Sequence, residues 1–169
     1  MRFLFFLFLT TSIFSQQTTP KTAFLEKWNN SKEYLIKMAE SMPEEQYDYR
    51  PAEDKMSFKD QIIHICGNML WLSTTYFLDK KFDRKAYKDN PPGSKKEVIE
   101  LLNTSFDKAY DAVMISKEKD LESEVDFFAG PKSKLQILNL LQDHVTHHRG
   151  QLIVYLNLND IKPPKYVGW

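Results

Sequence analysis

The chain has few of the residues that stabilise small disulfide-linked or turn-rich proteins. Its 169 residues include one cysteine, Cys66, so no intramolecular disulfide can form and packing alone must hold the fold together. Only five glycines are present, which argues against an all-β protein with many tight turns. Lys+Arg and Asp+Glu are equal at 23 each, so the charge balance indicates neither a nucleic-acid-binding surface nor a strongly acidic protein.

Long hydrophobic runs are also scarce, and the longest one, Phe3–Leu9, lies at the N-terminus. It follows Met1-Arg2 and precedes a zone of small polar residues, a pattern typical of a secretory signal peptide and too short to span a bilayer. We predict a signal peptide over residues 1–15, cleaved after Ser15, although Ile13 fits the small-residue rule poorly. An uncleaved membrane anchor is the alternative. Residues 16–169 would then form one exported domain, periplasmic or secreted, with a net charge of 22 − 23 = −1.

Four later segments repeat apolar residues at the spacing of an α-helix. Helices are predicted from Thr22 to about Met42, from Ser57 to about Leu78, from Ser94 to about Met114, and from Ser133 to about Asn159. Residues 43–56 look extended, and residues 117–132 look like a linker with room for a short extended piece. The tail after Pro163-Pro164 is expected to pack back on the helices. With no convincing strand, the prediction is an all-α four-helix bundle.

Three of the four histidines fall in the motif HVTHHRGQ, residues 144–151. His144 and His148 are four residues apart, so on a helix both imidazoles lie on one face. His147 lies about 100° further round and is predicted to be a surface or supporting residue. The fourth histidine, His64, belongs to the second predicted helix. Three imidazoles from two packed helices would form a metal site with an open position, as in catalytic zinc sites.

Residues around these histidines have both structural and functional interpretations. Cys66 is predicted to be a small buried side chain, and a thiolate ligand beside His64 is the alternative. Gly67 could open a gap for water or a ligand, or could allow close helix packing. Gly150 costs a helix about 1 kcal/mol relative to alanine, which predicts the close approach of another backbone. Trp28, Trp71, Tyr76 and Phe77 are expected in the core, with a pocket mouth as the alternative.

The combined motifs resemble the DinB-like (DinB/YfiT) superfamily of metal-binding four-helix bundles. The matching pieces are YDYRP at 47–51, the segment from Ser57 to Ile65, the fourth-helix motif, and the Pro163-Pro164 pair. The resemblance covers nearly all of the mature chain. It implies that His64, His144 and His148 are the metal ligands, that the ion is divalent, with zinc expected and nickel the alternative, and that homodimers are frequent. Arg149 and Gln151, in the same motif, are expected to orient neighbouring loops through hydrogen bonds.

What the resemblance implies about function is a metal-dependent enzyme whose three-histidine site activates water, as a hydrolase, or a thiol, as a transferase. Its substrate would be an unidentified small molecule, and export favours water because reduced small thiols are mainly cytoplasmic. A non-catalytic metal- or ligand-binding bundle and a purely structural bundle are the alternatives. No carboxylate is clearly placed as a general base. Asp143 points away from the histidine face, and Asp60 serves better as a helix cap or as a partner of His64.

Overall fold

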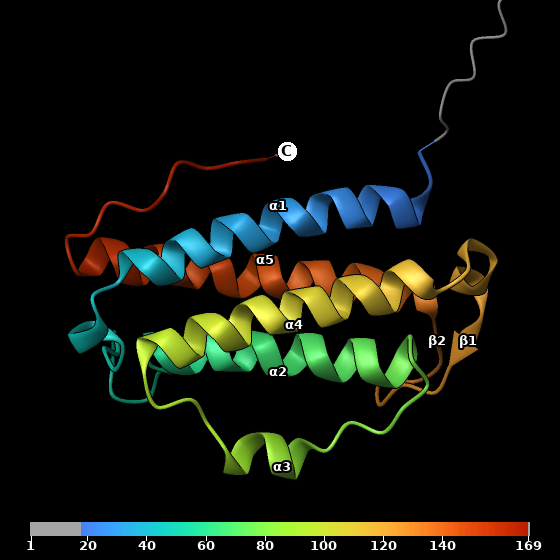
Figure 1. Ribbon diagram of the computed structural model, residues 1–169, viewed down its shortest axis with the longest axis horizontal. Helices are drawn as coiled ribbons and strands as arrows, with labels where there is room; N and C mark the ends of the chain where they lie inside the picture. The colour runs from blue at the N-terminus through green and yellow to red at the C-terminus, as the bar shows by residue number, and fades with distance from the viewer. Residues whose placement is uncertain (1–17, 169) are drawn as a thin grey trace, which may run out of the picture.

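The computed structural model describes residues 18–168, so the predicted signal peptide lies outside the described residues. Four long helices make up most of it: α1 (Pro20–Ser41), α2 (Phe58–Tyr76), α4 (Lys95–Ile115) and α5 (Lys134–Leu158). A short helix, α3 (Arg84–Asp89), lies outside α2 (Figure 1). The predicted all-α fold is confirmed. No helix in this part of the chain is both long and apolar enough to cross a membrane.

Each long helix begins with a capping box, in which the cap and the third helical residue exchange hydrogen bonds. Ser57 with Asp60, Ser94 with Glu97 and Ser133 with Gln136 start the second to fourth long helices, and the sequence predicts these three starts. The first helix begins earlier than predicted. Thr19 is its cap and Pro20 its first residue, while Thr22 completes the box from inside the helix. Proline is tolerated there because the first turn leaves its N–H groups unpaired.

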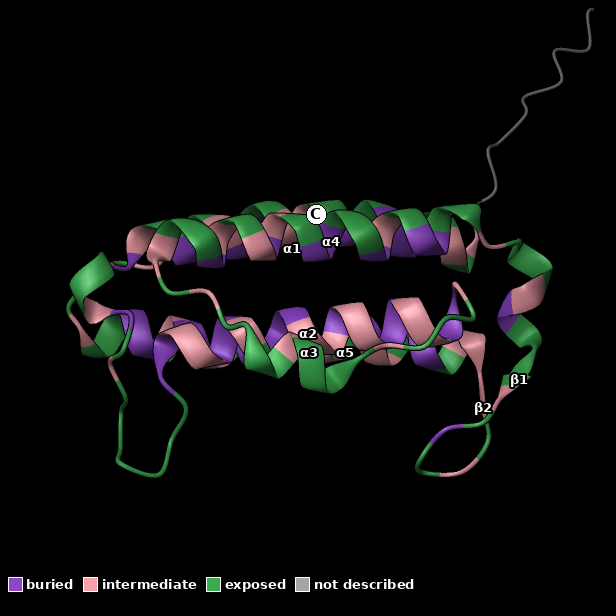
Figure 2. Ribbon diagram, turned by 60° about the horizontal axis from the view of Figure 1, so that its bottom comes forward, coloured by how far each residue is buried: buried purple, intermediate pink, exposed green. Residues whose placement is uncertain are grey.

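The long helices pack in two layers, with α1 and α4 in one and α2 and α5 in the other (Figure 2). Colour along the chain shows that α2 and α4 run in the same direction, opposite to α1 and α5 (Figure 1). Because α2 and α4 are parallel neighbours, the connection between them must return along the length of the bundle. That connection, residues 77–94, contains α3 and passes over the outer face of α2.

The core lies between the two layers and is mostly aliphatic, with ten buried aromatic side chains among the described residues. Trp28 is fully buried, stacks on Phe24 and donates a hydrogen bond from Nε1 to the carbonyl oxygen of Phe106 (3.1 Å). Tyr76 and Phe77 are also buried, as the core interpretation predicts. Trp71 is only half-buried and lines a pocket, so the pocket interpretation holds for that residue.

The connections contain short elements, of which the sequence predicts only the extended piece within residues 117–132, found as β1 (Glu124–Val125). Residues 43–56 are not simply extended, because they include the 3-10 turn η1 (Glu44–Gln46). The segment after α4 forms a second 3-10 turn, η2 (Glu118–Glu122), and a strand β1 (Glu124–Val125) that pairs antiparallel with β2 (Lys132–Ser133). The C-terminal tail packs back as predicted, with Tyr166 edge-on to Tyr34.

Candidate metal site

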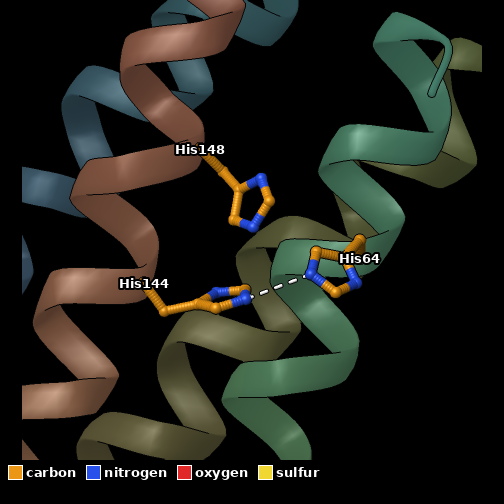
Figure 3. A group of neighbouring side chains, drawn as sticks. All are labelled: His64, His144 and His148. Carbon is orange, nitrogen blue, oxygen red and sulfur yellow. Dashed lines mark hydrogen bonds between the residues drawn. The ribbon is translucent and has the colours of Figure 1, made fainter. Parts of the chain in front are cut away.

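Helices α2 and α5 bring His64, His144 and His148 together, although 80 residues separate the first two. One ring nitrogen from each lies within 4.8 Å of the others. Nε2 of His144 is 3.1 Å from Nε2 of His64. Figure 3 shows both α5 rings directed toward the ring from α2. The i, i+4 spacing on α5 and the facing position on α2 therefore produce the cluster that the sequence predicts.

A chain of hydrogen bonds between α2 and α5 fixes the orientation of His148. Nδ1 of His148 donates to Oε1 of Gln61 (2.6 Å), which leaves Nε2 of His148 with a free lone pair. Gln61 Nε2 donates to Oε1 of Gln151 (2.6 Å), and Gln151 Nε2 donates to Nε2 of His147 (2.9 Å). The hydroxyl of Tyr155 lies 3.4 Å from Gln61 Nε2 and donates to the carbonyl oxygen of Met56. Such partners are what hold metal-binding imidazoles in one tautomer.

The environment keeps all three imidazoles neutral. Burial, reinforced by the neighbouring histidines, lowers the pKa of His144 to about 3. Burial and the charges of His64 and His147 lower the pKa of His148 to about 4, against a hydrogen bond that raises it. Burial also lowers the pKa of His64. A metal ligand must be unprotonated, so at neutral pH these rings need release no proton to bind an ion.

The donor set fits a divalent metal. Two nitrogens bound to one tetrahedral zinc at about 2.0–2.1 Å would lie about 3.3 Å apart. The observed separation of 3.1 Å between His64 and His144 requires little movement. Three neutral imidazoles suit zinc, nickel, copper or iron, whereas calcium and magnesium prefer oxygen ligands. Nδ1 of His144 is buried and has no hydrogen-bond partner in the described chain. Of the two α5 histidines in the cluster, His148 is therefore the one whose Nδ1 is held by a hydrogen bond in the described residues.

Comparison with known proteins places this chain in a family. Residues 28–152 match the model of the DinB superfamily. The chain belongs to the DinB superfamily. Its relatives include the uncharacterized protein YjoA of Bacillus subtilis strain 168, which is 24% identical over 122 residues, or 70% of this chain and 77% of YjoA.

Solved structures share the fold of this DinB superfamily chain. The crystal structure of YjoA, a DinB-like protein, matches with a TM-score of 0.71 and 20% identity, over 85% of this chain and 96% of that chain. A DinB-like protein from Bacillus cereus ATCC 10987 matches with a TM-score of 0.71 and 24% identity, over 85% and 95% of the two chains. At these identities the likeness shows a shared fold and no shared activity.

The remaining histidine and the cysteine lie outside the cluster. His147 is exposed and supports Gln151 through its hydrogen bond, which agrees with the predicted supporting role. Cys66 is fully buried, and burial raises the pKa of its thiol to about 12. A thiol with such a pKa is neither a ready ligand nor a nucleophile at neutral pH, so the buried-side-chain interpretation is correct.

No carboxylate belongs to the three-histidine cluster within residues 18–168. Asp60 caps α2 through Ser57 and pairs with Arg50 (2.7 Å), so it is a cap and not a partner of His64. Burial raises the pKa of Asp60, but the hydrogen bonds from Ser57 and the charge of Arg50 outweigh that effect and keep the pKa below its ordinary value. Asp143 is exposed. Arg50 therefore stabilises the start of the helix that carries His64.

Two expectations for the motif on α5 are wrong. A Cβ added at Gly150 would meet nothing within 4 Å, so no backbone approaches this glycine. Arg149 does not orient a loop by hydrogen bonds: it is 6% exposed, its guanidinium lies 5.3 Å from the ring centre of Tyr34, and its Nη1 has no hydrogen-bond partner in the described chain. Gln151 does form hydrogen bonds, but with a helix, because it contacts Gln61 on α2.

Sequence reasoning misses Gln61, although a signal for it exists. Gln61 lies four residues before Ile65 on the apolar stripe of α2, where an amide needs a buried partner. Gln61 is only 5% exposed, and its hydrogen bond with His148 explains why a glutamine lies on the buried face of α2. A glutamine on the core face three residues before a candidate ligand could therefore have been predicted to support the site.

Proposed function

We propose that this DinB superfamily protein is a divalent-metal-dependent enzyme that acts on a small organic molecule. His64, His144 and His148 would hold the ion, with zinc the expected metal and nickel the alternative. When bound, the ion would supply a Lewis acid able to activate water or a thiol. The observation that carries the proposal is the convergence of three neutral imidazoles, one of them oriented by a buried hydrogen-bond network.

The protein's own residues would contribute orientation and access. Gln61 accepts a hydrogen bond from His148 and is itself held by Gln151, so the orientation of His148 is fixed before an ion binds. His64 is exposed and also lines a pocket on the outer face of α2, which gives a substrate a route to the cluster. Gly67 shapes this pocket by accommodating the ring of Tyr87, since a Cβ there would lie 2.8 Å from Cε1 of that ring.

A non-catalytic metal- or ligand-binding bundle is the second candidate. It is favoured by one observation: the carboxylate nearest in sequence to His64, Asp60, is already engaged as a helix cap and ion pair. Without a free base, proton transfer would depend on the activated nucleophile itself or on the substrate.

Turnover assays separate the two candidates. Zinc- and nickel-loaded protein should be assayed against a panel of esters, amides and electrophiles with small thiols as acceptors, with chelator-treated protein and His144→Ala as controls. The enzyme proposal expects turnover that is lost in both controls. Activity that survives in the controls would reject the metal-dependent enzyme, and no turnover with any substrate would favour the binding protein.

We propose further that the protein is exported, as its N-terminal sequence indicates, and that it can form a homodimer, as its resemblance to the family implies. N-terminal sequencing of protein from the native host tests export, since the mature chain should begin at Gln16. Finding Met1 at the N-terminus of a soluble cytoplasmic form would reject it. Sedimentation at micromolar concentration tests the dimer.

A further inference from the structure

A pocket of about 670 Å³ lies beside the histidine cluster, between α2 and the connection that contains α3. His64 forms part of its wall, whereas His144 and His148 do not line it. Most of the remaining wall is apolar or aromatic: Ile63, Trp71, Phe82, Tyr87 and Phe128. A cavity of this size and character suits a small organic molecule.

The pocket is built into the fold, because the connection is fastened to α2. Tyr87 lies against Gly67, where a side chain would collide with its ring, and its hydroxyl donates to the carbonyl oxygen of Ile63 (2.5 Å). Phe82 packs against the same tyrosine ring, with 5.8 Å between ring centres. The outer wall is therefore held in place by a specific contact one turn along α2 from His64.

The charged groups at this pocket leave it with a positive character. Arg84 and Lys88 both line it, and neither forms an ion pair with a carboxylate within 4.0 Å in the described part of the chain. The guanidinium of Arg84 lies 4.1 Å from the centre of the Trp71 ring, so it is held over the aromatic wall. Asp60 is the one acidic side chain in the lining, and its charge is already paired with Arg50.

We infer that this pocket binds organic anions with an apolar or aromatic body. The body would lie against Trp71 and Phe128, and a carboxylate, sulfonate or phosphate group would meet Arg84 and Lys88. A reactive group at the other end would then face His64. The inference rests on the proposed function, because it names the substrate class of the same metal site.

An aromatic sulfonate and its uncharged counterpart test this directly. The affinities of 8-anilinonaphthalene-1-sulfonate and N-phenyl-1-naphthylamine are measured by fluorescence titration of folded protein at physiological ionic strength. R84Q/K88Q should weaken the sulfonate roughly tenfold, the effect of losing two partly exposed charge interactions, and change the amine less than twofold. K80Q/K81Q is the matched control, since it removes the same net charge from exposed lysines that lie outside the pocket lining and form no ion pair in the described residues. It should leave both affinities within twofold.

Equal weakening of both probes by R84Q/K88Q, an equal loss in the control, or no saturable sulfonate binding would overturn the inference.

Zinc loading tests the link between the pocket and the metal site. An ion beside His64 should tighten sulfonate binding several-fold in the wild type but not in H144A/H148A. If zinc binds the wild type and leaves the sulfonate affinity unchanged, this inference fails while the metal site stands. If zinc does not bind at all, the proposed function fails, even where Arg84 and Lys88 still select the sulfonate.

Discussion

Oε1 of Gln61 accepts a hydrogen bond from Nδ1 of His148 across the interface between α2 and α5, at 2.6 Å. This bond fixes the histidine in the tautomer whose Nε2 lone pair faces the cluster. Gln61 in turn is held by Gln151, a residue of the fourth-helix motif. One role of this motif is therefore to support the ligand geometry from behind, in addition to supplying two of the imidazoles.

Replacing Gln61 by leucine should weaken zinc binding by about 10- to 100-fold, the usual cost of losing a hydrogen-bond partner of a metal ligand. Gln61→Glu keeps an acceptor for Nδ1 of His148, so it should bind zinc at least tenfold more tightly than Gln61→Leu does. Competition with a chromophoric chelator measures both affinities. Gln142→Leu is a suitable control because Gln142 lies on α5 but bonds Ser31 and Thr146. Equal affinities for Gln61→Leu and the wild type would show that Gln61 does not position His148.

The metal-free protein should lose stability as the pH falls below about 6.5. An unfolded histidine titrates near pH 6.5, whereas the folded pKa is about 4 for His148 and about 3 for His144. Between these values the unfolded chain binds more protons, so acidification favours unfolding until the folded rings are also protonated. Urea unfolding in chelator at pH 7.5 and pH 5.0 measures the loss. His144→Gln/His148→Gln should lose less stability over this interval, and an equal loss would contradict the lowered pKa values.

The two helical glycines near the site should respond oppositely to alanine. Gly150→Ala should stabilise the protein by up to about 1 kcal/mol, because alanine favours the helix and its Cβ meets nothing within 4 Å. Gly67→Ala should not show this gain, because its Cβ would lie 2.8 Å from Cε1 of Tyr87 and displace the ring. The free energy of unfolding in urea measures the difference, and limited proteolysis of residues 77–94 should accelerate only in Gly67→Ala. Equal stabilisation by both changes would contradict the packing of Tyr87 on Gly67.

Much of the fold follows from local signals in the sequence. The starts at Ser57, Ser94 and Ser133 are predictable because each cap is made by residues three apart. The convergence of His144 and His148 is equally local, since one helical turn separates them. His64 follows from its apolar helix and from the resemblance to the DinB superfamily. These features depend on helix periodicity, which a single sequence expresses directly.

The remaining features depend on contacts between distant segments. Gly67 was open to two interpretations because its neighbour, Tyr87, comes from a connection whose path the periodicity does not specify. The short helix α3 has no apolar stripe, so nothing in its own sequence predicts that Arg84 would lie over Trp71. The prediction that another backbone approaches Gly150 is wrong, because the motif shows that a glycine occurs but not what surrounds it.

Metal stoichiometry tests the central claim most directly. Purified wild-type protein, dialysed against zinc and then against metal-free buffer, is analysed by inductively coupled plasma mass spectrometry beside His144→Ala/His148→Ala and His147→Ala. The wild type and His147→Ala should each retain about one divalent ion per chain, because His147 lies outside the cluster. The double variant should retain none, and only the proteins that hold an ion should melt at a lower temperature in chelator. A metal-free wild type whose melting temperature is unchanged by chelator would contradict a metal site at His64, His144 and His148.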